Sequence, residues 1–528
     1  MQTTAPAQDD GARMPAGILY IVGNEFAERF CYYGINAILS VYLVRYLHFG
    51  DAQATVWQSV FKSGAYFFPL VGAIVSDVFW GKFRTIITFS IAYTAGCAIL
   101  ALAPTTTVWV ASGLGLMAFG TGGIKPCVST NVGDQFTSRN QHLIERAFSY
   151  FYLSINAGSF ISIILCPILL DSYGPRLAFG MPAVAMMLAT VVFYLGRRRF
   201  VVVPPAGKAW LKDVFSPDGL KLIGNLLLVY LFVAGFWSLW EQSNGQTWTL
   251  QATSDLMDKD IGFGITMLPA QIQVVNALFI LLMVPLFTFG IYPLWAKFTT
   301  VTPLRKIGAG IFIAAASFLI VGRIEAHIQA GQGVSVYWQI LAYVVLTASE
   351  VLVSITCLEF SYKQAPLRMK SFIMALYLLA ISAGNASTAL VNDMMVKPLP
   401  GASGASGEQT WVQLPAGTQV VTGQKIDFAH TGLTVALPGG KSAPLEGTFL
   451  AAEVQGGRIR LMDNEHRRPV ATSGEWDSAH AEVSTYKLVG PEYFNFFAYA
   501  MAGMGVVFIF VAMAYRERIY VRADSDAA

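Results

Sequence analysis

Long apolar blocks alternate with short polar stretches along most of the chain. Twelve blocks approach or exceed the roughly 20 residues that a helix needs to cross a bilayer. Many are longer than that, so we expect tilted helices. The pattern predicts an all-α membrane protein with twelve transmembrane helices, at about 17–48, 53–80, 83–103, 108–133, 145–170, 177–198, 220–250, 269–296, 306–328, 335–362, 370–397 and 490–514.

A basic stretch divides these helices into six and six. Residues 200–219 contain Pro204 and Pro205 and form the expected cytoplasmic linker. Two six-helix bundles joined in this way are typical of a two-bundle secondary transporter. We expect the first bundle at 1–199, the second at 220–397 and 487–520, and a cytoplasmic tail at 521–528.

A second polar break, 398–486, is rich in Gly, Pro, Ser and Thr. Alternating residues predict strands at 418–421, 433–437 and 458–462, with turn signals such as 438–440 between them. The break falls between helices 11 and 12, and counting helices places it outside the cytoplasm. We expect a small β-rich extracytoplasmic insertion that the core activity does not need.

Charge and cysteine content narrow the class of protein further. Only 13% of the 528 residues are charged, against about 25% in soluble proteins. The net charge of +3 is too small to indicate nucleic acid, and the five cysteines show neither a disulfide framework nor a metal-ligand spacing. Lys and Arg number eighteen in the loops of one side and at most four on the other. Both termini are therefore expected in the cytoplasm, and the plasma membrane (the inner membrane in a bacterium) is the expected location.

The first span carries charges on one helical face. Glu25, Glu28, Arg29 and Tyr32 follow the i, i+3, i+4, i+7 spacing. Each ionisable residue inside a bilayer costs about 2.5–3.5 kcal/mol, so such residues indicate function. Two acids with one base predict a group that exchanges a partner for a proton. A structural ion-pair knot between helices is the alternative.

Two lysines also fall inside spans. Lys125 precedes Pro126 in the fourth span, and a buried lysine must find a carboxylate or lose its proton. It binds either a ligand carboxylate or, as a permanent partner, Glu25 or Glu28. Lys62 in the second span either extends towards the interface or pairs with a group of helix 1.

The second half carries acids instead, with Glu241, Glu350 and Glu359 in its spans. Cations in one bundle and anions in the other suit a zwitterion, with its carboxylate towards Arg29 and Lys125 and its amine towards Glu350. Two extended residues span about 7 Å, so short peptides or amino acids fit this charge pattern. Because no histidine lies at mid-membrane, the carboxylates must handle the proton.

Small and aromatic residues of the spans have a default role in packing. Four glycines are predicted to be helix contacts, namely Gly72, Gly120, Gly158 and Gly384. Aromatic residues that share a face with a charge are better candidates for a site than the rest.

Several motifs together resemble the proton-coupled oligopeptide transporter family of the major facilitator superfamily. The first is E-x-x-E-R-F-x-Y-Y-G at 25–34, and G-x-x-K-P at 122–126 and F-Y-x-x-I-N-x-G at 151–158 follow. The loop residues Asp77, Gly81 and Lys82 resemble the superfamily's loop motif. Residues 248–252 and 358–371 are most similar to animal peptide transporters. The resemblance covers about 15–397 and 487–520, but not 398–486.

This resemblance implies roles for individual residues. The implied proton-coupling residues are Glu25, Glu28, Arg29, Lys125 and Glu241. The implied peptide-binding residues are Arg29, Tyr32, Tyr33, Tyr66, Lys125, Asn156, Trp237, Asn276, Glu350 and Tyr377. The chain departs from the family at Asn36, where most members have the arginine that pairs with the helix 7 acid. It also has Ser59 in place of the animal histidine and Tyr377 in place of a common tryptophan.

The predicted function is a proton-coupled symporter that imports di- and tripeptides by alternating access. We expect no cofactor or metal beside the coupling proton, a functional monomer, and no enzymatic activity, since no nucleophile–base pair is visible. One alternative is a transporter of the same family for another substrate such as nitrate, which would offer Glu350 no amine. Another is a membrane sensor that uses 398–486 as its ligand-binding domain.

Overall fold

The computed structural model describes residues 14–136, 140, 143–202, 204–205, 214–364, 370–437 and 441–515. Parts of the sequence predictions lie outside this range: residues 1–13 and 516–520 at the bundle ends, most of the linker, the motif positions 365–369, the turn 438–440 and the tail 521–528.

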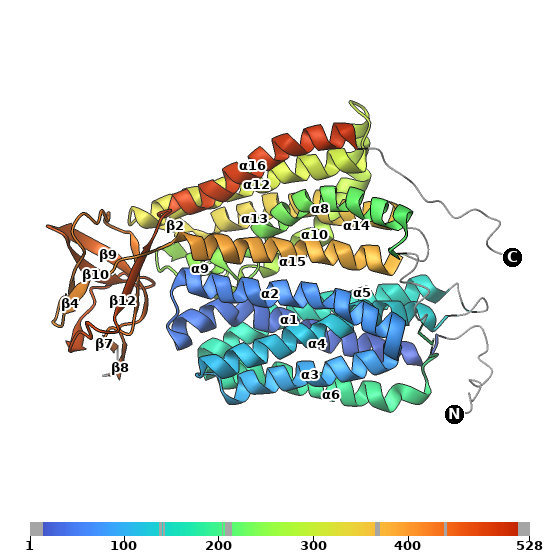
Figure 1. Cartoon of the computed structure of the whole chain (residues 1–528), viewed down its shortest axis with the longest axis horizontal. Coiled ribbons are helices and arrows are strands. Elements are labelled where there is room, and N and C mark those ends of the chain that lie inside the picture. Colours follow the sequence, from blue (N-terminus) through green and yellow to red (C-terminus); the bar gives the residue numbers. More distant parts are fainter. Residues whose placement is uncertain are drawn as a thin grey trace.

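Helices make up most of the described chain, and Figure 1 shows them side by side in one elongated body. The helices that precede the linker are α1 Gly17–Leu47, α2 Asp51–Ile74, α3 Lys82–Leu102, α4 Thr107–Asp134, α5 Ile144–Tyr173 and α6 Pro175–Leu195. Those after it are α8 Pro217–Ser243, α9 Thr247–Ala252, α10 Val274–Leu286, α11 Tyr292–Ala296, α12 Pro303–Gln329, α13 Val336–Glu350, α14 Thr356–Gln364, α15 Lys370–Met395 and α16 Pro491–Ala514.

The helices pack as two groups, which we call the first bundle (α1–α6) and the second bundle (α8–α16). Within the first, α1 packs on α5 and α3 on α4, and within the second, α12 packs on α16 and α8 on α15. Each group has its own large cluster of buried apolar side chains. The bundles meet chiefly where α2 runs along α15.

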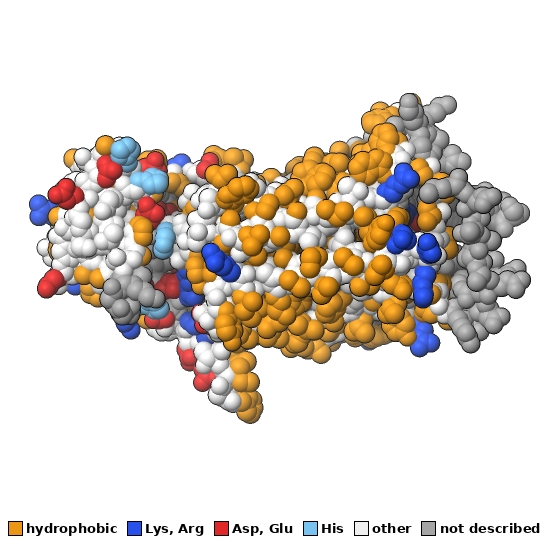
Figure 2. All heavy atoms as spheres, turned by 90° about the horizontal axis from the view of Figure 1, so that it is seen from below, with side chains coloured by type: hydrophobic (Ala, Val, Ile, Leu, Met, Phe, Trp, Pro, Cys, Tyr) orange, Lys and Arg blue, Asp and Glu red, His pale blue; other side chains and the backbone are white. Residues whose placement is uncertain are grey.

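Hydrophobic side chains cover the sides of this body, and Lys and Arg gather near one end (Figure 2). Eleven helical segments of the described chain are long and apolar enough to cross a membrane. The helix α1 is not among the eleven; it is as long as they are, but it carries Glu25, Glu28, Arg29 and Arg45. The protein is therefore mostly helical and built to span a membrane many times.

Local sequence explains where several helices begin. Ser216 accepts a hydrogen bond from the amide of Gly219 ahead of α8, and Thr302 accepts one from Arg305 ahead of α12. In both helices a proline follows the cap. A hydroxyl cap with proline in the first helical position satisfies the free amides and presets the backbone for a helix.

The four predicted glycine contacts are confirmed. A side chain at Gly72 would lie 2.2 Å from the carbonyl oxygen of Gly122, so α2 and α4 touch through their backbones. Gly120 packs in the same way on α3, Gly158 on α1 and Gly384 on α8. Such close approach is available only where one residue has no side chain.

Several predicted spans are not continuous α-helices. The span 53–80 changes from α2 to a π-helical segment at Val75–Trp80. The span 220–250 breaks after Ser243 and resumes as α9 at Thr247. The spans 269–296 and 335–362 each contain a π-helical turn, at Phe287–Ile291 and Val351–Ile355. Hydropathy does not reveal the π-helical turns within 269–296 and 335–362 because their residues remain mostly apolar, whereas the break between α8 and α9 falls on the polar residues 244–246.

The segment between α15 and α16 is β-rich, and we call it the insertion. Its strands are β3 Val396–Pro398, β4 Ser403–Ala405, β5 Trp411–Gln413, β6 Lys425–Ala429, β7 Leu433–Leu437, β8 Lys441–Pro444, β9 Gly447–Gln455, β10 Arg458–Asp463, β11 Thr472–Gly474 and β12 Glu482–Tyr486. Seven form an antiparallel sheet in the order β3-β12-β6-β9-β10-β5-β4, and three form a second sheet, β11-β7-β8.

Two of the predicted strands are confirmed, and one prediction is wrong. The strands at 433–437 and 458–462 correspond to β7 and β10, whereas 418–421 is an irregular stretch between two turns. Alternation holds where it matters for the core, since Ile426 and Phe428 of β6 and Ile459 of β10 are buried together. The insertion lies at the end of the helical body where α1 ends and α16 begins (Figure 1), which we call the insertion end.

Candidate functional site

The two glutamates of α1 share a single arginine. Arg29 Nε lies 2.8 Å from Glu25 Oε1, and Arg29 Nη2 lies 2.7 Å from Glu28 Oε2. Thr121 of α4 donates a 2.7 Å hydrogen bond to the other oxygen of Glu28. All three charged side chains are buried. With both acids ionised, this cluster holds two negative charges against one positive charge.

The ammonium group of Lys125 has no hydrogen-bond partner in the described part of the chain. Its Nζ lies 4.3 Å from the ring centre of Tyr32 and 3.9 Å from that of Tyr66. A desolvated ammonium gains about 2 kcal/mol from an aromatic face, and a carboxylate would supply more. The interpretation of Lys125 as permanent partner of Glu25 or Glu28 is wrong here, because both acids are paired with Arg29.

A carboxylate that has no cationic partner among the described residues lies in the second bundle. Glu350, the last residue of α13, accepts hydrogen bonds on Oε2 from Trp240 Nε1 at 2.9 Å and from Asn276 Nδ2 at 2.8 Å. Asn276 also donates to Thr347, which fixes its orientation. Neutral donors orient the carboxylate and leave its charge uncompensated. Trp240 was missed by sequence reasoning, although it lies one helical turn after the predicted Trp237.

The remaining predicted residues lie around these two centres. The Trp237 ring lies 5.1 Å from that of Trp240, and the Tyr377 hydroxyl lies 3.2 Å from that of Ser354. Tyr33 packs edge to face on Tyr32 and lies within electrostatic range of both Arg29 and Glu350. Asn156 is half-buried on α5, where its carbonyl accepts a hydrogen bond from Ser159.

The partner of Glu241 is Lys62. Lys62 Nζ lies 2.9 Å from Glu241 Oε2, and both side chains are 0% exposed. The same Nζ donates to the backbone carbonyls of Glu241 and Asn244. Both expectations for Lys62 are therefore wrong: it neither reaches the interface nor pairs with helix 1, but joins α2 to α8. The signal was present in the sequence, because each is an isolated charge in its span.

Asn36 belongs to the same network. Its Nδ2 lies 3.1 Å from Asn244 Oδ1, and its carbonyl accepts a hydrogen bond from Gln58. The break between α8 and α9 makes this possible by turning backbone carbonyls towards the first bundle. Gly245 has a φ of +78° there, and a side chain on it would lie 2.5 Å from the Asn36 carbonyl oxygen.

Charged side chains in the interior of two packed, membrane-spanning helical bundles are typical of a membrane transporter. A family model described as "POT family" matches residues 83–217 and 208–412, more than half of the chain. The chain belongs to the POT family, and the relatives it matches are transporters rather than enzymes.

Individual relatives agree with this assignment. Solute carrier family 15 member 2 of Danio rerio is 37% identical over 366 residues, which are 60% of this chain and 50% of the relative. Peptide transporter family 1 of Drosophila melanogaster is 36% identical over 362 residues, with 60% and 48% covered. The chain thus spans about half the length of the curated relatives it matches.

Solved structures are similar over more of their length. The crystal structure of the POT family transporter PepTSo has 34% sequence identity and a TM-score of 0.67, covering 72% of this chain and 90% of that one. A crystal structure of a proton dependent oligopeptide (POT) family transporter has 34% identity and a TM-score of 0.62, with 71% and 91% covered.

Proposed function

We propose that this protein is a proton-coupled symporter that imports di- and tripeptides by alternating access. Twelve transmembrane helices, α1 among them, would form two six-helix bundles in the plasma membrane (the inner membrane in a bacterium). Both termini would lie in the cytoplasm, so the insertion end would be extracytoplasmic. Family membership and relatives named as peptide transporters support this proposal. The basic end of the helical body supports the orientation.

One observation carries the choice of substrate, namely two charges of opposite sign, on the half-buried residues Lys125 and Glu350, without an ionic partner among the described residues. Lys125 Nζ lies on two tyrosine rings, and Glu350 is held by an indole and an amide. A peptide carboxylate on Lys125 and a peptide amine on Glu350 would neutralise both. Nitrate would satisfy only the first, which disfavours that alternative.

Proton coupling follows from the charge balance of the first bundle. Arg29 neutralises one of the two α1 glutamates, and Lys125, whose Nζ lies 4.3 Å from the ring centre of Tyr32 on the same helix, is the second cation. When a peptide carboxylate occupies Lys125, one glutamate loses its compensation and takes up a proton. Substrate and proton would thus bind together, with a coupling free energy of the usual 1–3 kcal/mol. No cofactor other than the proton enters this scheme.

The other residues would shape the peptide site. Tyr32, Tyr33, Tyr66, Asn156 and Asn276 offer hydroxyl and amide groups to the peptide backbone. Trp237 and Tyr377 would line a side-chain pocket. Glu241 would take a proton only when its pair with Lys62 opens, because Lys62 Nζ lies 2.9 Å from its Oε2. The proposed unit is a monomer.

The test is uptake of labelled dialanine into liposomes containing the purified protein. An inward proton gradient should drive accumulation, and a protonophore should abolish it. N-acetylated dialanine should compete poorly. A membrane sensor would show no accumulation under either condition, and a nitrate transporter would show none of dialanine; either result contradicts the proposal.

A further inference from the structure

The insertion is part of the second bundle by sequence, yet it binds the first bundle. Lys425 Nζ lies 2.6 Å from Asp51 Oδ2 at the start of α2. Glu465 receives two hydrogen bonds of 3.1 Å from the guanidinium of Arg45, in the last turn of α1. Two ion pairs therefore fix the hairpin between α1 and α2 to a segment that emerges from the other bundle.

The insertion also caps α2. Gly50 precedes the helix and offers no side chain to its free amides. The amide of Asp51 donates to Thr448 at 2.8 Å, and the amide of Ala52 donates to the Tyr486 hydroxyl at 3.3 Å. The first amides of a helix need partners from outside it, and here strands β9 and β12 of the insertion provide them.

The fit at this hairpin is close. A side chain at Gly50 would lie 2.2 Å from the carboxylate of Asp427. That carboxylate accepts hydrogen bonds from the same Thr448 and Tyr486 that receive the α2 amides. The hairpin therefore packs against polar side chains of the insertion that are already held in place by hydrogen bonds to one another.

The same segment holds the second bundle through other contacts. The amide of Asp255, after α9, donates to the carbonyl of Glu465 at 2.9 Å. His466 Nδ1 lies 2.9 Å from Asp255 Oδ2, and Arg467 donates to the carbonyl of Ile328 in α12. The turn 464–467 therefore touches both bundles within four residues.

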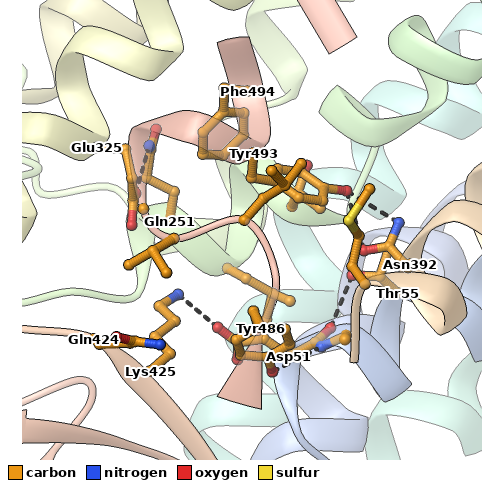
Figure 3. Close-up of a pocket in the computed structure, with 17 residues that line it drawn as sticks. Asp51, Thr55, Gln251, Glu325, Asn392, Gln424, Lys425, Tyr486, Tyr493 and Phe494 are labelled. Atoms are coloured by element: carbon orange, nitrogen blue, oxygen red, sulfur yellow. Dashed lines mark hydrogen bonds and ion pairs between the residues drawn. The ribbon is translucent and has the colours of Figure 1, made fainter. Parts of the chain in front are cut away.

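This junction is polar and incompletely filled. A cavity of about 90 Å³ lies between the insertion and the helix ends. Lys425 is directed towards Asp51 beside it (Figure 3). Glu325 of α12 and Tyr493 of α16 face the same space. Interfaces of this polar kind separate and re-form more readily than apolar ones.

We infer that the insertion is a clasp that holds the insertion ends of the two bundles together. This inference rests on the proposed function in one respect, since alternating access requires those ends to separate. In the present structure they are also joined directly, by Lys62 with Glu241 and by Ser63 with Ser382. Contacts that are present in just one of two conformations shift the equilibrium towards that conformation.

Spin-label distances test the clasp without relying on transport. The spin labels are attached to cysteines introduced by Thr105→Cys and Gln332→Cys. Thr105 lies in the exposed loop between α3 and α4, and Gln332 lies in the exposed loop after α12. All five native cysteines are buried, so the two introduced thiols label selectively. Distances are recorded by double electron–electron resonance on the labelled protein in lipid nanodiscs.

The double variant Lys425→Gln, Glu465→Gln removes both ion pairs. Both substituted residues lie in the insertion, so the sequence of every helix is unchanged. The population with separated ends should rise, by up to about fivefold for each pair removed. Arg460→Gln is the matched control, because it breaks an ion pair inside the insertion that touches neither bundle. Reversal of one pair, Arg45→Glu with Glu465→Arg, should return the distances to those of the wild type, whereas Arg45→Glu alone should not.

An unchanged distance distribution in the double variant, or an equal shift in the Arg460→Gln control, overturns the clasp. Dialanine uptake by the same preparations separates the two proposals. Shifted distances without any uptake support the clasp and contradict the proposed function. If the wild type takes up dialanine but the double variant shows unshifted distances, the clasp is contradicted and the proposed function is not.

Discussion

Lys62 of α2 and Glu241 of α8 form a fully buried ion pair that joins the two bundles, with Nζ 2.9 Å from Oε2. Removing two charges from water is costly, and their mutual attraction roughly offsets that cost. Loss of one partner leaves the other charge buried and uncompensated, which destabilises a protein by about 3–5 kcal/mol. The pair is therefore a device for conformational specificity more than for net stability.

The first prediction concerns this pair. Lys62→Gln should lower the melting temperature in detergent and reduce dialanine uptake at least tenfold, because Glu241 is left without a cation. Lys62→Gln with Glu241→Gln should recover most of the stability, since no buried charge remains. A double variant no more stable than Lys62→Gln would contradict this account.

An arginine on α1 offers a second test of the same pair. Asn36 Nδ2 and Lys62 Nζ both contact Asn244, so the two side chains approach one acceptor cluster. Adding Asn36→Arg to the Lys62→Gln variant should therefore restore the stability and uptake that this variant has lost. Asn36→Lys in the same background is the comparison for side-chain reach. Failure of both to restore stability would show that the position of Lys62 matters beyond its charge.

The second prediction concerns proton coupling. Glu28 is bound by Arg29 and Thr121, and it is proposed to alternate between ion pair and protonated acid. Glu28→Gln should abolish uptake driven by a proton gradient and spare peptide counterflow, which moves no net proton. Glu475→Gln, an exposed glutamate of the insertion, is the control. Undiminished accumulation in Glu28→Gln would remove Glu28 from the coupling group.

The third prediction concerns recognition of the peptide amine. In the wild type, N-acetyl dialanine should compete roughly tenfold to a hundredfold less well than dialanine, the difference expected for a hydrogen bond to a buried charge. In Glu350→Gln this ratio should fall towards one, because the carboxylate that requires the amine is gone. Equal competition by both peptides in the wild type would refute the assignment.

The fourth prediction concerns Lys125, which has no carboxylate partner in the structure. Lys125→Ala should lose both accumulation against a gradient and the preference for a free peptide carboxylate over an amide. Arg29 still pairs with Glu25 and Glu28, so the variant should fold, with a small loss of thermal stability from the missing cation. Lys125→Arg should retain the carboxylate preference. Wild-type accumulation in Lys125→Ala would show that coupling runs through other residues.

The fifth prediction concerns pH and the insertion. Burial and the neighbouring Asp51 raise the pKa of Asp427 to about 6, although hydrogen bonds from Tyr486 and Thr448 oppose this. The folded insertion thus binds a proton more tightly than the unfolded chain, whose value is 3.8. Its stability should be greatest below about pH 4 and fall, by about 2 kcal/mol, as pH rises to 6.

Hydrogen exchange of the amides in β6 and β12 measures this effect in the intact protein. After correction for intrinsic exchange rates, protection at pH 5 should exceed protection at pH 7. Asp427→Asn should remove the difference, because an amide does not titrate. Equal protection at the two pH values in the wild type would show that Asp427 does not titrate in this range.

The sequence by itself determined the helices and the positions of their charges. The cost of burying a residue in a bilayer is a local property, so runs of apolar residues located the spans to within a few residues. For the same reason, Glu25, Glu28, Lys125, Glu241 and Glu350 stood out as charges in apolar surroundings. The spacing of Glu25, Glu28 and Arg29 on one helix also predicted that they would meet.

Only the tertiary structure decided which charges are partners across the fold. Lys62 and Glu241 are 179 residues apart, and Arg45 and Glu465 are 420 apart. Their pairing depends on which helix faces are turned towards each other, and the break at Asn244 and the π-helical turn after α13 alter those faces in ways that hydropathy does not predict. The seating of the insertion on α1 and α2 likewise arises from packing between distant segments, which no local pattern records.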